Sequence, residues 1–454
     1  MKGFFFNKFP ILKKWRENEK IKQIAANSGW LSIDRLVTMV TGFFIAALLA
    51  RYLGPDRYGL LNYALSFVGL LAPFARLGLK DIAVRNIVRD PEEKNEILGT
   101  TFVLRVIGSI LGIAIVLVLV IYFRGFDTLV LLLTAVISVK LVFLSFETID
   151  YWFQSQVESK YTVWSRRGAY FCVALVKIIM VLLDAPLIAF AWAILAEAGL
   201  AALLRLAFYI KKQYSIFRWS VAWNRIRELL RDSWPLIISN LAIAIYMKVD
   251  RIMLGQMVGD SAVGVYSVAA KVSEVWYFIP TAIAASVFPA LIKTKEGAEH
   301  LYGERMQLLY DTLALLSYGV ALPLSLLAGP LINIVFGPEY SQAATILTVH
   351  VWAFVFVSIG VARSRWLIME DLQFYLMIFT LFGSLTNVGL NIYLIPIYGG
   401  LGAAWATVLA QLVAAYLSSL LFKRFWSVFK KETKALLLPF RFKSYYNSLK
   451  SLVD

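Results

Sequence analysis

The sequence predicts an all-α polytopic membrane protein with about twelve transmembrane helices in two pseudo-symmetric six-helix bundles. Three observations support this prediction. Of the 454 residues, 60% are hydrophobic and only 16% are charged. Apolar runs long enough to cross a bilayer recur from end to end, and basic residues collect in alternate loops between them. Soluble domains carry about 25% charged residues, so this chain lacks the polar surface of a soluble protein.

The N-terminal segment is expected to stay attached as a basic, amphipathic cytoplasmic arm over residues 1–26. Its first part, MKGFFFNKFPILKKWRENEK, breaks into charges before any signal-like apolar core, and no small-residue cleavage site follows. The single cysteine, Cys172, excludes an internal disulfide.

Twelve apolar stretches are long enough to cross the membrane, because one crossing needs about 20 residues. They cover residues 27–51, 58–79, 97–122, 128–151, 162–183, 187–210, 233–256, 262–291, 306–328, 340–366, 373–395 and 400–422.

The loops between these stretches alternate in charge. One set contains most of the lysines and arginines, whereas the other set consists of short turns with little beyond Arg57 and Arg124. The positive-inside rule then places both termini in the cytoplasm of a multi-pass inner (plasma) membrane protein. A missed helix would have broken the alternation.

The two halves of the chain resemble each other. LGPDRYGLLNYAL and VGDSAVGVYSVAA share a Gly-x4-Gly turn, with Gly54 and Gly59 matching Gly259 and Gly264. AWAILAEAGLAALL matches AWATVLAQLVAAYL, and YWFQSQ has a weaker match in RWLIME. The pairs stand in the same order at offsets of about 205 to 214 residues, which indicates two lobes in parallel repeat.

This repeat predicts a first lobe at residues 27–211 and a second lobe at 233–422. The connecting linker, 212–232, is basic and rich in aromatics, as is the tail at 423–454. We expect both to lie on the cytoplasmic membrane surface as amphipathic segments that bind anionic lipid.

Three stretches resemble the polysaccharide flippases of the O-antigen (Wzx) type, in the multidrug/oligosaccharidyl-lipid/polysaccharide (MOP) exporter superfamily. They are LLARYLGPDRYGLLNYALSFVGLLAPFARLGLKDIAVR, DRIMLGQMVGDSAVGVYSVAAKV and NVGLNIYLIPIYGGLGAAWATVLAQ. The resemblance covers nearly the whole membrane region, and the IP-x-YG-x-x-GAA pattern around Pro396 and Gly402 is its most specific part. Lipid II flippases of this superfamily usually have two more helices, for which this chain has no room.

The resemblance implies a V-shaped pair of six-helix bundles around a central cavity, as in the related MATE transporters. It also implies alternating access that carries a polyprenyl-diphosphate-linked oligosaccharide to the outer leaflet for surface polysaccharide biosynthesis. Membrane lipid and the lipid-linked glycan are the expected partners, with polysaccharide polymerase and glycosyltransferases acting alongside. Nucleic acid is excluded, because most of the positive charge lies in loops between apolar runs.

Ionisable residues inside the spans are the first candidates for substrate contact, since an anionic sugar diphosphate needs a wet, cationic path. Basic residues outnumber acidic ones by about two to one in the predicted spans, which favours an anionic substrate over a cationic drug. The cavity candidates are Arg35, Arg76, Lys140, Lys248, Arg251, Lys271 and Arg363, and the ion-coupling candidates are Asp34, Glu197, Asp250 and Glu274.

Residue counting from the turns gives approximate depths. Lys248 should lie level with Lys271, with Glu274 one helical turn deeper. Asp250 points away from Lys248, toward Arg251 or another helix. Asp250 and Arg251 lie close to the outer boundary, where an interfacial pair is the simplest interpretation. A similar count about the first turn sets Arg76 level with Asp34 and Arg35, in the cytoplasmic half of the first lobe.

Each candidate has a structural alternative. Arg105, Arg363, Arg365 and Asp34 have the alternative of snorkelling to the interface. Lys140, Glu197 and Lys248 have the alternative of an ion pair between helices, and His350 that of a packing residue.

An enzyme is not expected, because the outer loops are very short and the chain has two histidines. The absence of a Walker-type loop argues against direct use of ATP. No catalytic residue, metal or cofactor is expected. Export would instead use a proton gradient, a sodium gradient or the membrane potential. The main alternative function is a MATE-like, cation- or proton-coupled drug antiporter.

Overall fold

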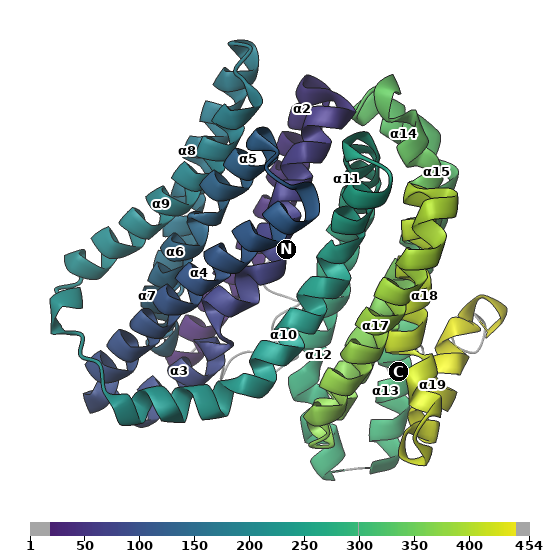
Figure 1. The fold of residues 1–454 in the computed structure, drawn as a ribbon. Helices are drawn as coiled ribbons and strands as arrows, with labels where there is room; N and C mark the ends of the chain where they lie inside the picture. The colour runs from purple at the N-terminus through teal and green to yellow at the C-terminus, as the bar shows by residue number, and fades with distance from the viewer. Residues whose placement is uncertain (1–18, 298, 442–454) are drawn as a thin grey trace, which may run out of the picture. The chain divides into compact units, whose positions relative to one another are not determined.

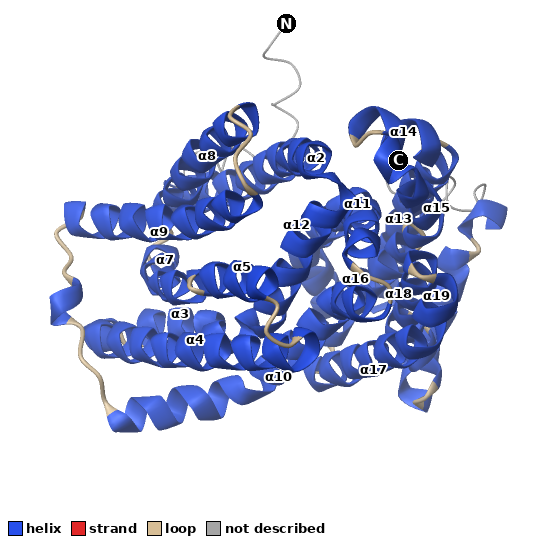
Figure 2. Ribbon diagram, turned by 45° about the horizontal axis from the view of Figure 1, so that its top comes forward, coloured by secondary structure: helices blue, strands red, loops and turns tan. Residues whose placement is uncertain are grey.

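A computed structural model describes residues 19–297 and 299–441, with side chains from residue 37 onward except at 296, 299 and 300. The N-terminal arm up to residue 18 and the end of the tail therefore lie outside the described residues. Within them, every regular element is a helix (Figures 1 and 2).

Nine helices contain most of the described helical residues. They are α2 (Glu19–Arg76), α4 (Lys94–Arg124), α8 (Lys160–Leu182), α9 (Leu187–Lys211), α10 (Trp223–Met257), α13 (Glu299–Leu326), α16 (Ala353–Met369), α17 (Gln373–Tyr398) and α18 (Gly400–Ala415).

The remaining helices complete the described part. They are α3 (Leu79–Arg89), α5 (Thr128–Ser138), α6 (Lys140–Leu144), α7 (Thr148–Ser155), α11 (Asp260–Glu274), α12 (Phe278–Gly297), α14 (Ala328–Val335), α15 (Ser341–His350) and α19 (Trp426–Leu436). Seven 3-10 turns lie between them: η1 (Pro91–Glu93), η2 (Ser145–Glu147), η3 (Ile216–Arg218), η4 (Val275–Tyr277), η5 (Pro338–Tyr340), η6 (Leu417–Leu420) and η7 (Lys423–Phe425).

Eight helical segments of the described chain are long and apolar enough to cross a membrane, or nine with the bent pair of α15 and α16. This count is lower than the predicted twelve for two reasons. The first two predicted spans form one helix, α2, which is broken only at Gly54 (φ 69°, ψ 172°). Two further helices, α8 and α10, cover predicted spans but carry several charged residues. When α2 is divided at Gly54 and α8 and α10 are included, the nine become twelve.

Contacts divide the described chain into two compact units. The first holds the residues up to Gly42, Phe74–Ala114 and Val136–Trp234, and the second holds Phe43–Pro73, Ile115–Ala135 and the chain from Pro235 onward. These units differ from the predicted lobes, because α2, α4, α5 and α10 each contribute to both. The lobes as bodies that move during transport remain a prediction.

The linker is attached to the first unit by ion pairs. Lys212 pairs with Glu158 at 2.8 Å, and Arg85 pairs with Asp232 at 2.7 Å. Phe217 is 94% exposed, as an aromatic side chain at a membrane surface would be. The linker thus contacts the first unit through charged residues and exposes an aromatic side chain.

The first part of the tail is docked through a buried polar contact. Helix α19 packs on α13, and the fully buried carboxylate of Glu432 lies 3.9 Å from Nε of Arg363 on α16. Arg363 donates to the hydroxyls of Ser418 and Ser419 at 2.9 and 3.0 Å. Tyr310 of α13 faces the same pair. Helix α19 is therefore held to α13 and α16 by a buried polar contact, and the membrane-surface position of the tail remains a prediction.

The pH should control this docking. Burial raises the pKa of Glu432 to about 7, and the Arg363 guanidinium and the Ser419 hydroxyl only partly offset the effect. The pKa of Glu432 in the folded protein lies above its ordinary value of 4.5, so the docked helix favours the protonated carboxyl. The docked state of α19 is therefore most stable below about pH 4.5 and loses this stability as pH rises through about 7. We expect slower hydrogen exchange in α19 at about pH 6 than at about pH 8.

Glu432→Gln, which keeps the shape and removes the charge, should make exchange in α19 independent of pH. Lys430→Gln, on the exposed side of the same helix, is the matched control and should keep the wild-type profile. A wild-type pH profile in Glu432→Gln would contradict this account.

Candidate functional site

The two repeated turns meet in the second unit. Gly54 and Gly259 both have positive φ (69° and 126°), which a side chain would disfavour. A Cβ on Gly59 would overlap the carbonyl oxygen of Asp260, and one on Gly264 would overlap that of Pro55. The contact is reciprocal, because Pro55 follows Gly54 as Asp260 follows Gly259. The Gly-x4-Gly match in the sequence thus corresponds to a contact between two backbones.

Polar side chains join this contact on one side. Arg124 pairs with Asp260, donates to the Gly255 carbonyl at 3.0 Å and lies 4.4 Å from the Tyr63 ring centre. The Tyr63 hydroxyl accepts a hydrogen bond from Gln256. The charge pattern of the loops predicts that these turns face the outside. Helix ends from the two sequence halves are therefore in direct contact here. Sequence analysis placed Arg124 in an outer turn but did not assign it a role.

Several basic side chains surround one carboxylate, Glu274 of α11. Arg251 lies 3.3 Å from Glu274, and both Lys248 and Lys271 interact with it electrostatically. The stem of Lys248 also passes α2, with its Cε 3.4 Å from where a Cβ on Gly69 would lie. The predicted grouping of Lys248, Lys271 and Glu274 is therefore present. With Asp250, which also acts on Arg251, three basic side chains face two carboxylates, so the cluster remains net positive.

Asp250 and Arg251 are not an interfacial pair, and that expectation is corrected. They are only 4% and 6% exposed. Asp250 accepts hydrogen bonds from Asn391 (2.6 Å), Tyr266 (2.7 Å) and Thr407 (2.8 Å). Consecutive helix positions point about 100° apart, so Asp250 faces α17 and α18 while Arg251 faces Glu274.

Two asparagines complete the surroundings of Asp250. Asn387 and Asn391 lie one turn apart on α17, and both are fully buried. Within the described residues, Oδ1 of Asn391 and Nδ2 of Asn387 have no hydrogen-bond partner. Sequence reasoning missed both because it ranked ionisable residues alone. Two asparagines at i, i+4 spacing in an otherwise apolar span were the available signal.

In the first unit, Glu147 is held by two arginines. Arg105 donates to it at 2.8 Å and to the Tyr151 hydroxyl at 2.5 Å, and Arg76 approaches it at 3.3 Å. Arg105 is 0% exposed, so the snorkelling interpretation of this residue is wrong. Arg76 has a half-exposed side chain and is the more accessible of the two cations.

The remaining candidates have mostly structural partners. Glu197 pairs with Lys177 at 2.8 Å, which favours the ion-pair alternative. Lys140 is half-buried at the start of α6, in the field of Glu197, Arg76 and Lys177. The other placements are as follows: Arg363 docks the tail, His350 is buried against the edge of Tyr266, and the side chains of Asp34 and Arg35 lie outside the described residues. The cavity and coupling roles of all these candidates remain predictions.

Comparison with known protein families identifies the family of this chain. The family described as "Polysaccharide biosynthesis protein" matches residues 24–295, which is more than half of the chain. The chain belongs to this family.

Curated relatives agree with this assignment. The probable flippase AglR of Haloferax volcanii is 33% identical over 40% of this chain, and the match spans only 39% of that relative. The capsular polysaccharide biosynthesis protein CapF of Staphylococcus aureus is 21% identical over 86% of this chain and 96% of its own length. The family resemblance predicted from the sequence is confirmed.

Solved structures show the fold. The lipid II flippase MurJ, in an inward closed conformation, covers 93% of this chain and 95% of its own, with a TM-score of 0.69 at 16% identity. An inward-facing MATE transporter of the MOP superfamily covers 88% and 98%, with a TM-score of 0.66 at 15% identity. The chain is an all-α, multi-span membrane protein with the MOP fold, as predicted.

The glycine contact allows a direct test. Gly264→Ala adds a Cβ that overlaps Pro55, so the two backbones must separate. In a Cys172→Ser background, a cysteine at Gln256 should then react faster with a membrane-impermeant maleimide. Gly319→Ala is the matched control, because its Cβ would meet no atom within 4 Å. Equal labelling rates in the two alanine variants would show that the contact is not close.

Proposed function

We propose that this protein is a flippase that moves polyprenyl-diphosphate-linked oligosaccharide repeat units from the cytoplasmic to the outer leaflet for surface polysaccharide biosynthesis. It would work by alternating access through a cationic cavity. Membership of the polysaccharide biosynthesis family, relatives named for flipping and capsule synthesis, and a fold shared with a lipid II flippase all support the proposal. The same relatives favour a transporter over a catalytic enzyme.

The observation that carries the proposal is the surplus of positive charge inside the spans. Glu274 is shared by Arg251, Lys248 and Lys271, and Glu147 is shared by Arg105 and Arg76. Buried cations are costly, and their cost is reduced when an anion joins them. A diphosphate head group supplies that anion, and the sugar can remain hydrated.

The closed turns at Gly59 and Gly264 are consistent with alternating access. A carrier that accepts its substrate from the cytoplasm must be closed on the outer side at that moment. Arg124 and Asp260 would then have to separate when the substrate leaves. Their ion pair is partly exposed, with side chains 18% and 24% accessible, so water can solvate both charges after separation.

A MATE-like drug antiporter is the alternative, because MATE transporters share the fold. A cationic drug needs an available carboxylate. In the described spans Glu147, Glu197 and Glu274 already contact basic side chains, Asp250 accepts three hydrogen bonds, and Asp311 is buried and accepts one from Gln307. This arrangement favours the anionic substrate.

Asp250 is our candidate for energy coupling. Its carboxylate contacts Thr407 and Asn391, and Asn391 in turn contacts Asn387. Side-chain oxygens of these residues suit a proton or a hard cation such as Na⁺. The rival driving force is the membrane potential, which would favour outward movement of two negative charges by roughly 4 to 5 kcal/mol at 100 mV.

The proposed location is the inner (plasma) membrane, with both termini in the cytoplasm, from the loop charges. Glycosyltransferases on the cytoplasmic side would supply the lipid-linked unit. A polymerase on the outer side would consume it.

Removal of cavity charge should impair export. We expect Lys248→Ala and Arg76→Ala each to lower surface glycan by about tenfold, the equivalent of one lost charge-assisted contact. Membrane abundance, measured on the same cells, should stay at the wild-type level. Arg231→Ala is the matched control, because that arginine is 79% exposed outside the spans.

Normal glycan export in both Lys248→Ala and Arg76→Ala, with normal abundance, would remove the cavity assignment. Loss of abundance in either variant would assign its side chain to folding instead.

Asp250→Asn should abolish the coupling of transport to an ion gradient without removing substrate binding. In proteoliposomes, we expect the wild-type rate to respond to an imposed sodium or proton gradient and the variant rate to be independent of both. Asp311→Asn is the matched control, since Asp311 is equally buried at 4% exposure. A variant that keeps the gradient response would exclude Asp250, and a wild type driven by potential alone would exclude ion coupling.

A further inference from the structure

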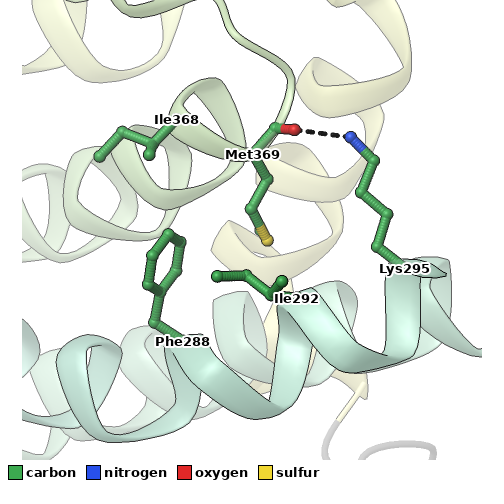
Figure 3. Close-up of a pocket in the computed structure, with 5 residues that line it drawn as sticks. All are labelled: Phe288, Ile292, Lys295, Ile368 and Met369. Atoms are coloured by element: carbon green, nitrogen blue, oxygen red, sulfur yellow. Dashed lines mark hydrogen bonds between the residues drawn. The ribbon is translucent and has the colours of Figure 1, made fainter.

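An apolar pocket of about 520 Å³ lies between α12 and α16. Phe288 and Ile292 line it from α12, and Ile368 and Met369 line it from the end of α16 (Figure 3). The fifth lining residue, Lys295, stands at the end of the row on α12. The volume falls in the range of small-ligand sites, so the pocket can hold a chain-like apolar group.

The charge of Lys295 is already balanced. Its ammonium donates to the Met369 carbonyl at 2.6 Å, as Figure 3 shows, and pairs with Glu370 at 3.0 Å. These contacts tie the ends of α12 and α16 together beside the pocket. Lys295 therefore holds the two helix ends together at its end of the pocket and contributes little net charge to the pocket.

Arg365 supplies the unbalanced charge. Its guanidinium lies 5.4 Å from the ring centre of Phe288, the aromatic residue that lines the pocket. In the described part of the chain no carboxylate forms an ion pair with it, and its buried Nε has no hydrogen-bond acceptor. Nε of Arg105, Arg124 and Arg363 also lacks an acceptor, but each of those arginines pairs with a carboxylate, whereas Arg365 does not within the described residues. A partly buried cation without a counter-ion favours an anionic partner.

The position of the pocket selects an amphiphile over a soluble anion. The apolar helical segment that includes α12 ends at Lys295, and α16 ends beside it at Met369. From Phe288 to Lys295 the helix rises about 10 Å, so the pocket follows the last turns of the apolar segment, where hydrocarbon meets the head groups, and Arg365 lies beside its Phe288 end. Ile292 is 38% exposed, which leaves the pocket accessible from lipid.

The surroundings are also basic. The neighbouring Lys293 and Arg305 are both exposed near the end of α12, and Arg305 donates to Thr294. Among the described side chains at this end, Glu370 is the only carboxylate paired to Lys295 or Arg365. Basic pockets between transmembrane helices bind anionic head groups, and the loop charges predict that this end faces the cytoplasm.

We propose that this pocket is a binding site for an anionic glycerophospholipid of the membrane. One acyl chain fills the space beside Phe288 and Ile292, and the phosphate accepts hydrogen bonds from Arg365. Such a lipid would pack between α12 and α16 where Lys295 and Met369 already join them. The site is separate from the charged clusters around Glu274 and Glu147, and the inference does not depend on the proposed transport activity.

The test measures lipid binding to the full-length protein. Delipidated protein is titrated with phosphatidylglycerol or phosphatidylcholine, and bound lipid is counted by native mass spectrometry. We expect a saturable phosphatidylglycerol site that Arg365→Gln weakens by about tenfold, because a charge-assisted contact is lost. Arg365→Lys should keep part of the affinity. Arg57→Gln, an exposed arginine in a predicted outer turn, should change nothing.

A second variant tests the acyl-chain part of the proposal. Ile292→Trp adds bulk at the exposed edge of the pocket and should weaken phosphatidylglycerol binding without loss of folded protein. Inorganic phosphate should fail to compete at millimolar concentration. The proposal is overturned if phosphatidylcholine binds equally well, if Arg365→Gln and Ile292→Trp both bind as the wild type does, or if free phosphate displaces the lipid.

Discussion

A charge inside hydrocarbon persists only beside a partner, and the packing of the spans depends on this constraint. Arg105 is fully buried and fixes Glu147 and Tyr151 around itself. Asp250 does the same in the second unit, where it draws α11, α17 and α18 toward α10 through three hydrogen bonds. Removal of one partner would leave an uncompensated buried charge, which costs on the order of 3 to 5 kcal/mol. These residues therefore act as fixed points around which the surplus cations are arranged.

The glycine contact adds a different constraint, because it depends on the absence of side chains. Gly59 and Gly264 allow two backbones to approach closely, so the closed state is held by shape and by the Arg124–Asp260 pair. Under the proposed alternating access, both contacts would have to separate in each transport cycle.

Much of this arrangement could be predicted from the sequence. Apolar length placed the helices, and residue counting from Gly259 set Lys248 level with Lys271, one helical turn from Glu274. Counting fixes depth but not the neighbouring helix, so it could not find that Asp250 meets Asn391 and Thr407. It also could not separate a snorkelling arginine from a buried one, because a long side chain reaches either solvent or a partner from the same backbone position.

The central claim is that surplus positive charge selects an anionic lipid-linked substrate. The most direct measurement uses proteoliposomes that contain a polyprenyl-linked oligosaccharide with two phosphates, with one phosphate or with none, and follows translocation with a leaflet-specific reagent. The account predicts that the diphosphate lipid crosses fastest, that the uncharged lipid crosses no faster than in empty vesicles, and that a cationic dye is not transported. Transport of the dye without translocation of the diphosphate lipid would contradict it.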